Sequence, residues 1–333
     1  MKINIGKKVI NKNSLPFIIA EAGSNFDQSL KKAIDLIKIA KKAECDAVKF
    51  QLFDASKLYP ENKVMRKIFQ NIQIKRSFLI KIKKKCDELN IEFMCSPFDL
   101  ESAKFLSKIG INSFKIASSE ISNYKLLNYA ARSKKLCLVS LGMAIEEDVI
   151  KIKKIFKKYK NRNLVLMQCT SEYPAKLKNL NLRYLTHISQ KHKLLSGFSD
   201  HSLGHYASIV ALGQGANFFE KHFTYNKKAK GPDHSYALNP KELTKYVKVL
   251  KKNSVCLGNK DKIELIDGVK NFSRRCGLYL KRDIKAGELI KKNHLIFKAP
   301  PKGFLDIEID KVLNKKIQVN KKKHQFLSKD DFI

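Results

Sequence analysis

Phe17-Ile-Ile-Ala-Glu21 is an apolar run of four residues that ends directly in a carboxylate, and this pattern decides the fold. An apolar run of this length predicts a strand that is buried on both faces. Eight such runs occur within the first ~250 residues, the length of a typical (β/α)8 barrel. They are residues 17–20, 47–52, 91–95, 113–116, 136–140, 164–169, 194–198 and 217–223.

The segments between these runs predict helices. Several have the 3.6-residue periodicity of an amphipathic helix, namely 30–42, 76–89, 100–109, 122–132 and 146–158. Strands that alternate with helices in this number predict an α/β fold, the (β/α)8 or TIM barrel. A doubly wound sheet is the competing fold, but no Gly-x-Gly-x-x-Gly turn follows any run. Before the first run, residues 3–5 and 9–10 predict a short hairpin.

Polar residues stand at the end of every predicted strand. Active sites of barrels lie at the C-terminal ends of the strands, so these side chains are expected to converge. One or two of them could be strand caps, whereas eight of eight indicate a site. They are Glu21; Lys49 and Gln51; Ser96; Lys115, Ser118 and Glu120; Ser140; Gln168 and Thr170; Ser199, Asp200 and His201; and Glu220, Lys221 and His222.

The pattern of apolar runs and turn residues changes after the predicted barrel. From about Ser273 onward, short β-like runs alternate with turns, and residues 283–296 are loosely repeated by 319–333. We predict a barrel domain at 1–256, a linker at 257–272 and a small β-rich domain at 273–333. A domain this short can barely form a stable hydrophobic core by itself. We therefore expect it to pack on something larger.

The composition narrows the class of protein. There are 67 Lys+Arg residues against 31 Asp+Glu, a formal net charge of +36. The lysines are spread over the whole length and only eight of the 67 are Arg, so we predict a solvated surface and no nucleic-acid partner. Apolar runs are far shorter than the ~20 residues that span a bilayer, and no signal peptide is recognisable. Seven cysteines without a Cys-x-x-Cys pair favour a reducing compartment, so we predict a cytoplasmic protein without a membrane partner.

Two histidines close neighbouring predicted strands. His201 and His222 are therefore expected on one rim, within reach of one divalent ion. Two imidazoles with carboxylates or water suit a Mn²⁺, Zn²⁺ or Fe²⁺ site. The alternative is that each is a hydrogen-bonded structural histidine. Five of the other histidines lack this context and are interpreted as surface or packing residues, namely His187, His192, His205, His294 and His324.

Three lysines lie inside strand runs, where an unpaired charge is costly. Lys49, Lys115 and Lys221 allow two readings: one of them is the Schiff-base lysine of an aldolase, or they form an anion cradle with neighbouring serines. Several cations and hydroxyls suit a multiply charged anion better, so we favour the cradle. Glu21 is placed to be a general base, or else pairs with a lysine. Asp233, in a turn beyond the eighth run, either caps the next segment or reaches the metal rim.

The order of these motifs resembles one family. The sequence is similar to the N-acetylneuraminate (sialic acid) synthase family through nearly the whole barrel, and the last 60 or so residues resemble its antifreeze-like, or SAF, domain. Each motif alone is modest, but eight in register are specific. The matching stretches are 18–25, 47–51, 96–99, 114–118, 140–143, 169–174, 197–201 and 220–224.

The resemblance implies a transferase that condenses phosphoenolpyruvate with an N-acetylated aminosugar such as N-acetylmannosamine. The products would be a nine-carbon 2-keto acid and phosphate. It implies metal ligands at His201 and His222, with Mn²⁺ as the expected ion and Mg²⁺ or Co²⁺ as alternatives, and catalytic roles for Glu21 and Lys115. It also implies a homodimer in which the C-terminal domain of one chain closes over the other barrel. The implied substrate-binding residues are Lys49, Gln51, Ser96, Ser118, Glu120, Ser140, Tyr173, Ser199, Lys221 and Asp233.

Two departures from the family pattern bear on the acceptor sugar. Phe26 stands where the family often has a histidine, and Ala299 stands where an arginine typically meets the N-acetyl group. A related acceptor, leading to a legionaminic- or pseudaminic-type product, is therefore the alternative within the family. Outside it, the rivals are a Schiff-base barrel aldolase and a non-catalytic polyanion-binding protein.

Overall fold

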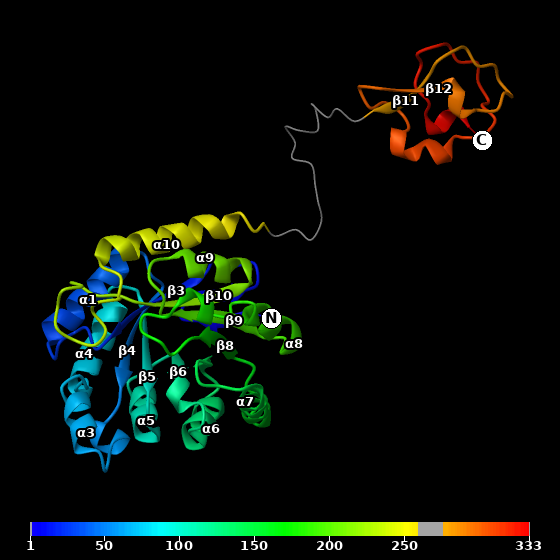
Figure 1. Ribbon diagram of the computed structural model, residues 1–333. Coiled ribbons are helices and arrows are strands. Elements are labelled where there is room, and N and C mark those ends of the chain that lie inside the picture. The colour runs from blue at the N-terminus through cyan, green and yellow to red at the C-terminus, as the bar shows by residue number, and fades with distance from the viewer. Residues whose placement is uncertain (1, 259–275, 333) are drawn as a thin grey trace. The chain divides into compact units, whose positions relative to one another are not determined.

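The computed structural model describes residues 2–258 and 276–332. The chain divides into two compact units, Met1–Asn259 and Lys260–Ile333 (Figure 1). Most of the predicted linker at 257–272, and the first residues of the predicted C-terminal domain, lie outside the described residues.

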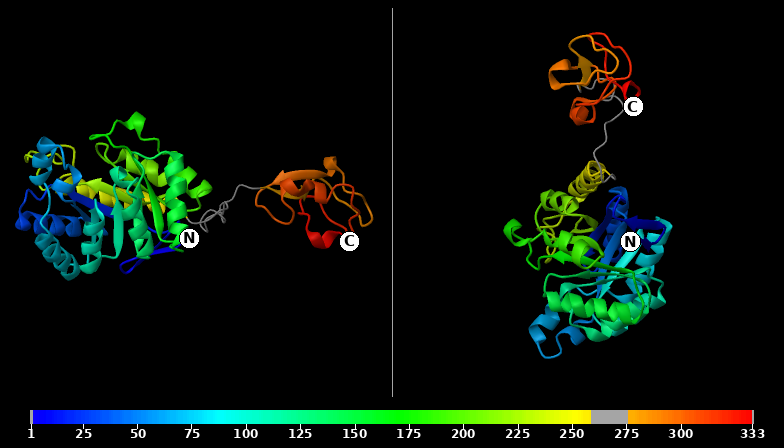
Figure 2. Two further views of the ribbon diagram at one scale, coloured as in Figure 1. Left: turned by 90° about the horizontal axis from the view of Figure 1, so that it is seen from below. Right: turned by 90° about the vertical axis from the view of Figure 1, so that its right-hand side faces the viewer.

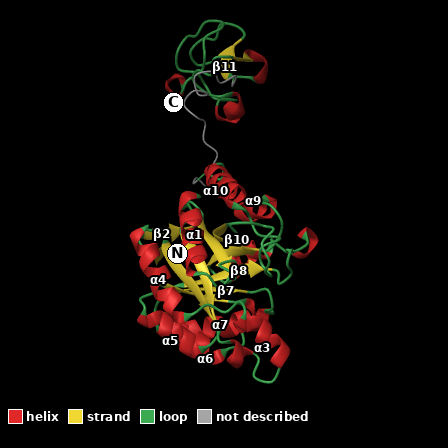
Figure 3. Ribbon diagram, turned by 90° about the vertical axis from the view of Figure 1, so that its left-hand side faces the viewer, coloured by secondary structure: helices red, strands yellow, loops and turns green. Residues whose placement is uncertain are grey.

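The first unit contains a closed barrel of eight parallel strands in the order β10-β3-β4-β5-β6-β7-β8-β9. Figures 2 and 3 show these strands inside a layer of helices. The eight predicted strands and the barrel are confirmed. The strands are β3 (Phe17–Gly23), β4 (Ala47–Leu52), β5 (Glu92–Pro97), β6 (Ser113–Ile116), β7 (Leu136–Ser140), β8 (Leu164–Cys169), β9 (Leu195–Asp200) and β10 (Ala216–His222).

The helices cover the barrel because each turns an apolar stripe inward. In α1 (Leu30–Lys42), Ala33, Leu36, Ile37 and Ala40 are buried, at the spacing of one helix face. The helices that follow α1 are α2 (Ala55–Leu58), α3 (Lys63–Gln70), α4 (Arg76–Glu88), α5 (Leu100–Lys108), α6 (Tyr124–Arg132), α7 (Glu146–Lys158), α8 (Tyr184–Lys191), α9 (Tyr206–Gly213) and α10 (Pro240–Val255), with 3-10 turns at Ser118–Glu120 and Leu177–Asn179. All five predicted helices are present, as α1, α4, α5, α6 and α7.

A second apolar core fills the N-terminal half of the barrel interior. The predicted hairpin is present as β1 (Lys2–Ile5) and β2 (Lys8–Asn11), and Ile3, Ile5 and Ile10 pack in one cluster with barrel residues such as Phe17 and Met94. Because side chains fill this end, polar groups on the strands can gather only at the C-terminal mouth.

The second unit is small and built from short antiparallel pairs. Strand β11 (Gly277–Leu280) pairs with β12 (Leu295–Lys298) over a core that includes Leu278, Ile290 and Leu327. The two repeated segments contact one another, because an isolated bridge with two backbone hydrogen bonds of 2.8 Å joins Ile284 to Lys321. The 3-10 turns are Lys292–His294, Asp306–Lys311 and Lys329–Asp331.

Among the described residues, no helix combines the length and the apolar character needed to cross a lipid bilayer.

Candidate active site

The ends of the barrel strands enclose a polar hollow of about 230 Å³, called here the inner cavity. All eight strands, or the residues just beyond them, contribute to it. The predicted lysines and serines that line it are Lys49, Ser96, Lys115, Ser118, Ser140 and Ser199. The other predicted residues on its wall are Glu21, Gln51, Tyr173, His201 and His222.

Two ammonium groups and two carboxylates form a buried network in this cavity. Lys49 Nζ lies 3.1 Å from Glu21 Oε2 and 3.3 Å from Glu220 Oε2. Lys115 Nζ lies 3.2 Å from Glu220 Oε1, which also accepts a hydrogen bond of 2.9 Å from Ser199 Oγ. The four formal charges cancel, so the network itself tolerates burial.

Burial and mutual charge set the pKa values in the network. Burial raises the pKa of Glu21, and Lys49 only partly opposes this. Burial alone would raise the pKa of Glu220 as well, but the ammonium groups of Lys115 and Lys49 outweigh it and hold this pKa below its ordinary value. Burial lowers the pKa of Lys115, and Glu220 acts in the opposite direction. Two carboxylates with pKa values pushed apart are a common arrangement of catalytic sites.

Glu220 is the centre of this network, and sequence reasoning did not single it out. The signal was available in the alternation of side chains along a strand. Glu220 and His222 point to the barrel interior, so Lys221 between them points outward. Lys221 Nζ lies 2.9 Å from Asp200 Oδ2 and also hydrogen-bonds the carbonyl of Ser202.

Two predicted substrate-binding residues are not brought to the mouth. Lys221 is not among the described residues that line the inner cavity or the second hollow beside it, because strand β10 turns its side chain toward the helices. Glu120 lies in a short 3-10 turn and accepts a hydrogen bond of 2.9 Å from Asn123 Nδ2, its local partner. It does not line the inner cavity, although Ser118 and Ser119 of the same turn do.

Replacing Lys221 by methionine is expected to lower stability and to leave binding of an anionic substrate unchanged. Breaking a buried ion pair by removing one partner costs about 3–5 kcal/mol, since Asp200 would remain buried and charged. Urea unfolding measures this loss, and the double variant Lys221→Met/Asp200→Asn should recover part of it. A stable Lys221→Met variant with a strongly raised KM for an anionic substrate would instead return Lys221 to the cradle.

The two predicted metal-binding histidines face one another across the mouth. The ring centroids of His201 and His222 are 5.6 Å apart. His201 Nδ1 donates a hydrogen bond of 2.8 Å to the carbonyl of Thr170, which leaves Nε2 as the free lone pair. His222 Nδ1 is buried and has no hydrogen-bond partner among the described residues. One imidazole is oriented by a hydrogen bond, and the second has a ring nitrogen without a partner among the described residues. This is the donor arrangement of an open metal site.

Asp233 is positioned beside His222. Its Oδ2 accepts a hydrogen bond of 2.9 Å from Ser24 Oγ, and its Oδ1 accepts one of 2.8 Å from Tyr236 OH. Burial would raise the pKa of Asp233, but His222 and these donors hold it below its ordinary value, so it is a carboxylate at neutral pH. Gly23 permits this approach: its φ is +51°, and a Cβ there would lie 2.7 Å from Asp233 Oδ2.

A second hollow of about 310 Å³, called here the outer cavity, adjoins the first. The two share Gln51, Tyr173 and His222 as a common wall. The far wall of the outer cavity is apolar and is formed by Phe53, Phe69 and Ile72. Helix α3, which ends at Gln70, supplies part of this wall and was not among the predicted helices.

Phe26 and Ala299, the two departures from the family pattern, lie in different units of the chain. Phe26 is buried and packs against Phe50 in the core between strands and helices, with ring centroids 6.4 Å apart. It therefore lines neither cavity. Ala299 follows β12 in the second unit.

A parallel barrel with two imidazoles beside buried ammonium, carboxylate and hydroxyl groups belongs to the class of barrel enzymes that act on an anionic substrate. Comparison with known proteins gives the family. Residues 36–262 match the NeuB family and residues 276–333 match the SAF domain. The chain belongs to the NeuB family, and it is an enzyme of the condensing, transferase type. The resemblance found in the sequence is confirmed.

Relatives whose names state a function span nearly the whole chain. N,N'-diacetyllegionaminic acid synthase of Legionella pneumophila is 32% identical over 96% of this chain and 95% of its own. Pseudaminic acid synthase of Campylobacter jejuni is 31% identical over 97% of this chain and 98% of its own. The crystal structure of N-acetylneuraminic acid (sialic acid) synthetase from Leptospira borgpetersenii with citrate has a TM-score of 0.78 at 32% identity, covering 82% of this chain and 95% of that one.

Proposed function

We propose that this enzyme condenses phosphoenolpyruvate with an N-acetylated aminosugar to give a nine-carbon 2-keto acid and phosphate. The observation that carries the proposal is the pair of adjoining cavities. The inner one offers ammonium and hydroxyl groups suited to an anion, and the outer one offers an apolar wall suited to a sugar derivative. They meet at His222 and Tyr173, where the two substrates would react.

In the inner cavity, Lys49, Lys115 and the serines hold the phosphate and carboxylate of phosphoenolpyruvate. C3 of phosphoenolpyruvate attacks the aldehyde carbon, a C–C bond forms, and the aldehyde oxygen takes the electron pair of the C=O bond and a proton to become a hydroxyl. Water then adds to C2. The bond between C2 and the phosphate oxygen breaks as the new hydroxyl on C2 loses its proton and becomes the keto group, which releases phosphate. Glu21, whose pKa burial raises, takes the proton of that water. Ammonium groups fixed before the reaction stabilise the charge that develops on the phosphate.

His201, His222 and the carboxylate of Asp233 would hold a divalent cation, with Mn²⁺ as the expected ion. Bound there, the ion would polarise the aldehyde oxygen as a Lewis acid. The charge balance of the cavity supports such a cation. Lys49, Lys115, Glu21 and Glu220 cancel one another, so the negative charge of phosphoenolpyruvate calls for a further positive charge nearby.

The apolar wall of the outer cavity favours one kind of acceptor. Phe53, Phe69 and Ile72 suit methyl groups better than hydroxyls, because burying an unpaired hydroxyl is costly. A 6-deoxy di-N-acetylated hexose carries three methyl groups, whereas N-acetylmannosamine carries one. The names of the legionaminic and pseudaminic acid synthases among the relatives support this choice. We therefore place the enzyme nearer to these synthases than to N-acetylneuraminate synthases.

Phosphate release from phosphoenolpyruvate, measured with a panel of acceptors, tests the proposal. We expect release only when an N-acetylated aminosugar is present, and a higher kcat/KM for the 6-deoxy di-N-acetylated hexoses than for N-acetylmannosamine. A preference for N-acetylmannosamine would contradict the acceptor assignment alone. Absence of phosphate release with every sugar of the panel would contradict the condensation.

A Schiff-base aldolase is the second candidate, because burial lowers the pKa of Lys115. Its contact with Glu220 at 3.2 Å opposes this lowering of the pKa and favours the charged ammonium. Borohydride reduction in the presence of a keto acid separates the two mechanisms. The proposed condensation predicts no covalent adduct on Lys115 or Lys49.

Affinity for a divalent ion is expected to persist to a lower pH than at an ordinary histidine site. Burial lowers the pKa of His222, although Asp233 acts in the opposite direction. The imidazole therefore stays neutral as the pH falls through ~6.5, the usual histidine value, and affinity is lost only below it. Calorimetric titration with Mn²⁺ between about pH 5 and pH 8 locates this loss. A midpoint at or above ~6.5 would contradict the expected shift.

The homodimer, in which the SAF domain of one chain would close over the other barrel, stays a prediction from the resemblance. The cytoplasmic location also stays a prediction.

A further inference from the structure

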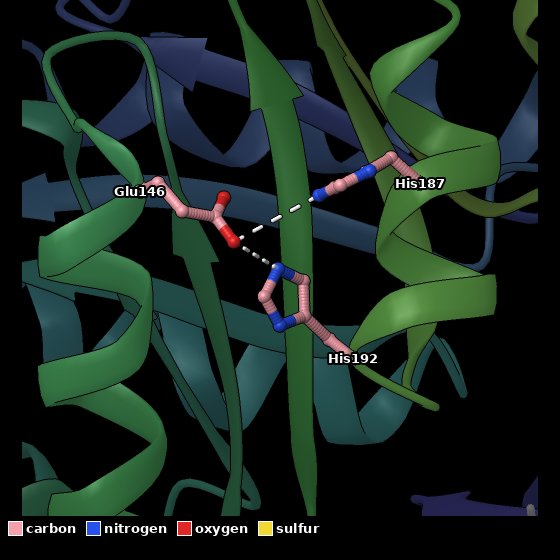
Figure 4. Close-up of side chains that lie close together, drawn as sticks. All are labelled: Glu146, His187 and His192. Carbon is pink, nitrogen blue, oxygen red and sulfur yellow. Dashed lines mark ion pairs between the residues drawn. The ribbon is translucent and has the colours of Figure 1, made fainter.

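Three metal-ligating side chains gather in the helical layer, outside the barrel mouth. Glu146 is the first residue of α7, His187 lies in α8, and His192 directly follows α8 (Figure 4). We call them the α7–α8 cluster. None of the three lines the inner or the outer cavity. The sequence interpretation of His187 and His192 as surface or packing residues did not bring them together with Glu146.

The donor atoms of the α7–α8 cluster have the separation that a metal ion requires. Glu146 Oε1 lies 3.3 Å from His192 Nε2 and 3.8 Å from His187 Nε2, and one donor atom from each residue lies within 4.8 Å of the others. Tetrahedral Zn²⁺ with bonds of about 2.0–2.1 Å places its ligand atoms roughly 3.3 Å apart. Within residues 2–258 and 276–332, no other three His, Cys, Asp or Glu donors meet this criterion.

A buried and unsatisfied nitrogen points into the cluster. The side chain of His192 is only 3% exposed, and its Nε2 makes no hydrogen bond of good geometry with any described residue, although Glu146 Oε1 lies 3.3 Å away. An unsatisfied buried polar atom costs about 1–3 kcal/mol, and a bound cation would remove this cost. Figure 4 shows both imidazoles turned toward the Glu146 carboxylate.

The protonation states of the donors suit a cation. Burial, followed by the charge of Lys153, lowers the pKa of His192, so its imidazole is neutral at pH 7. Hydrogen bonds from Lys191 and Tyr184 lower the pKa of Glu146 to about 2, so this group is a carboxylate. Metal ions bind neutral imidazole and ionised carboxylate.

Two lysines compete with a metal ion at this position. Lys191 Nζ lies 2.6 Å from Glu146 Oε1, but its side chain is 54% exposed and can turn into solvent when a divalent ion binds. Lys153 Nζ lies 3.3 Å from His192 Nδ1 and donates to it, which places the imidazole proton on Nε2. Metal binding would move this proton to Nδ1 and displace the Lys153 ammonium.

We propose that Glu146, His187 and His192 form a second divalent-cation site, for a borderline first-row ion such as Zn²⁺. Two nitrogens and one oxygen leave a fourth position for water. The ion joins α7 to α8, and because it binds the folded chain it raises the melting temperature. This site is independent of the chemistry at the mouth and of the proposed function.

The test compares His187→Gln with His205→Gln in the full chain. His187 is suited to substitution because its side chain is 41% exposed. His205 is a matched control: it stacks on Tyr206 at 4.7 Å, as His187 stacks on Tyr184 at 5.1 Å, but it has no place in the cluster. Equilibrium dialysis with Zn²⁺ at neutral pH gives the number of ions bound, and thermal unfolding with Zn²⁺ or with chelator gives the stabilisation.

We expect His187→Gln to lose one bound Zn²⁺ per chain and part of the Zn²⁺-dependent rise in melting temperature, while His205→Gln retains both. The loss should persist when the mouth ligand His222 is replaced by alanine. Lys191→Met, which removes the competing ammonium, should tighten Zn²⁺ binding. Equal Zn²⁺ stoichiometry in the wild type and His187→Gln would overturn the proposal, as would unchanged or weaker affinity in Lys191→Met.

Discussion

The His222→Ala variant is expected to lose all measurable turnover and to bind a catalytic divalent ion far more weakly than the wild type. His222 supplies one of the two imidazoles at the mouth, and it is the neighbour that lowers the pKa of Asp233. Without His222, only His201 and Asp233 would remain as strong donors. Two donors are too few to hold an ion that would also polarise the aldehyde. Phosphate release measures turnover, and calorimetry with Mn²⁺ measures affinity.

His205→Ala serves as the control, because His205 directly precedes α9 (Tyr206–Gly213) and lines neither of the two mouth cavities. It should retain activity and ion affinity. Circular dichroism should show that His222→Ala is folded, since His222 is buried but makes no hydrogen bond through Nδ1. Wild-type turnover in a folded His222→Ala variant would remove the metal assignment at the mouth.

Lys115→Ala is expected to raise the KM for phosphoenolpyruvate by roughly 10- to 100-fold, because a hydrogen bond to a charged group is worth about 1.5–3 kcal/mol. The KM for the sugar should change little. Lys115 lies in the inner cavity, whereas the apolar wall that would meet the sugar belongs to the outer cavity. Initial rates with each substrate varied in turn give both constants.

Lys115→Met is the companion variant, since it keeps the apolar stem and loses only the charge. Both variants leave Glu220 paired with Lys49 at 3.3 Å, so the fold should persist. Equal increases in the two KM values would count against an anion cradle at Lys115. Such a result would indicate a role shared by both substrates.

Strand and helix positions were predictable because local pattern encodes them. Short apolar runs mark strands buried on both faces, and the stripe in α1 repeats at helical spacing. The register then follows, since parallel strands in a barrel align their C-terminal ends: Glu21 is the neighbour of Lys49 on one side and of His222 on the other. Most of the predicted site residues reach one cavity for this reason.

The direction of single side chains was harder to predict. Lys221 and Glu220 are neighbours in sequence, and only the alternation of β10 sends one to Asp200 and the other to Lys49 and Lys115. Glu120 follows Ser118 in the same turn, yet its side chain remains with Asn123. A polar residue at a strand end is therefore only a candidate until its partners are known.

The sequence by itself determined the barrel, the SAF domain, the family and the convergence of polar strand ends, because each follows from local periodicity or from motifs read in order. The tertiary structure alone decided that Glu220 links Lys49 and Lys115, that α3 helps to form the apolar wall, and that Glu146 meets His187 and His192. These contacts join residues from separate elements. They depend on how the strands close into a barrel and how the helices pack around it, and no local pattern in the chain encodes that arrangement.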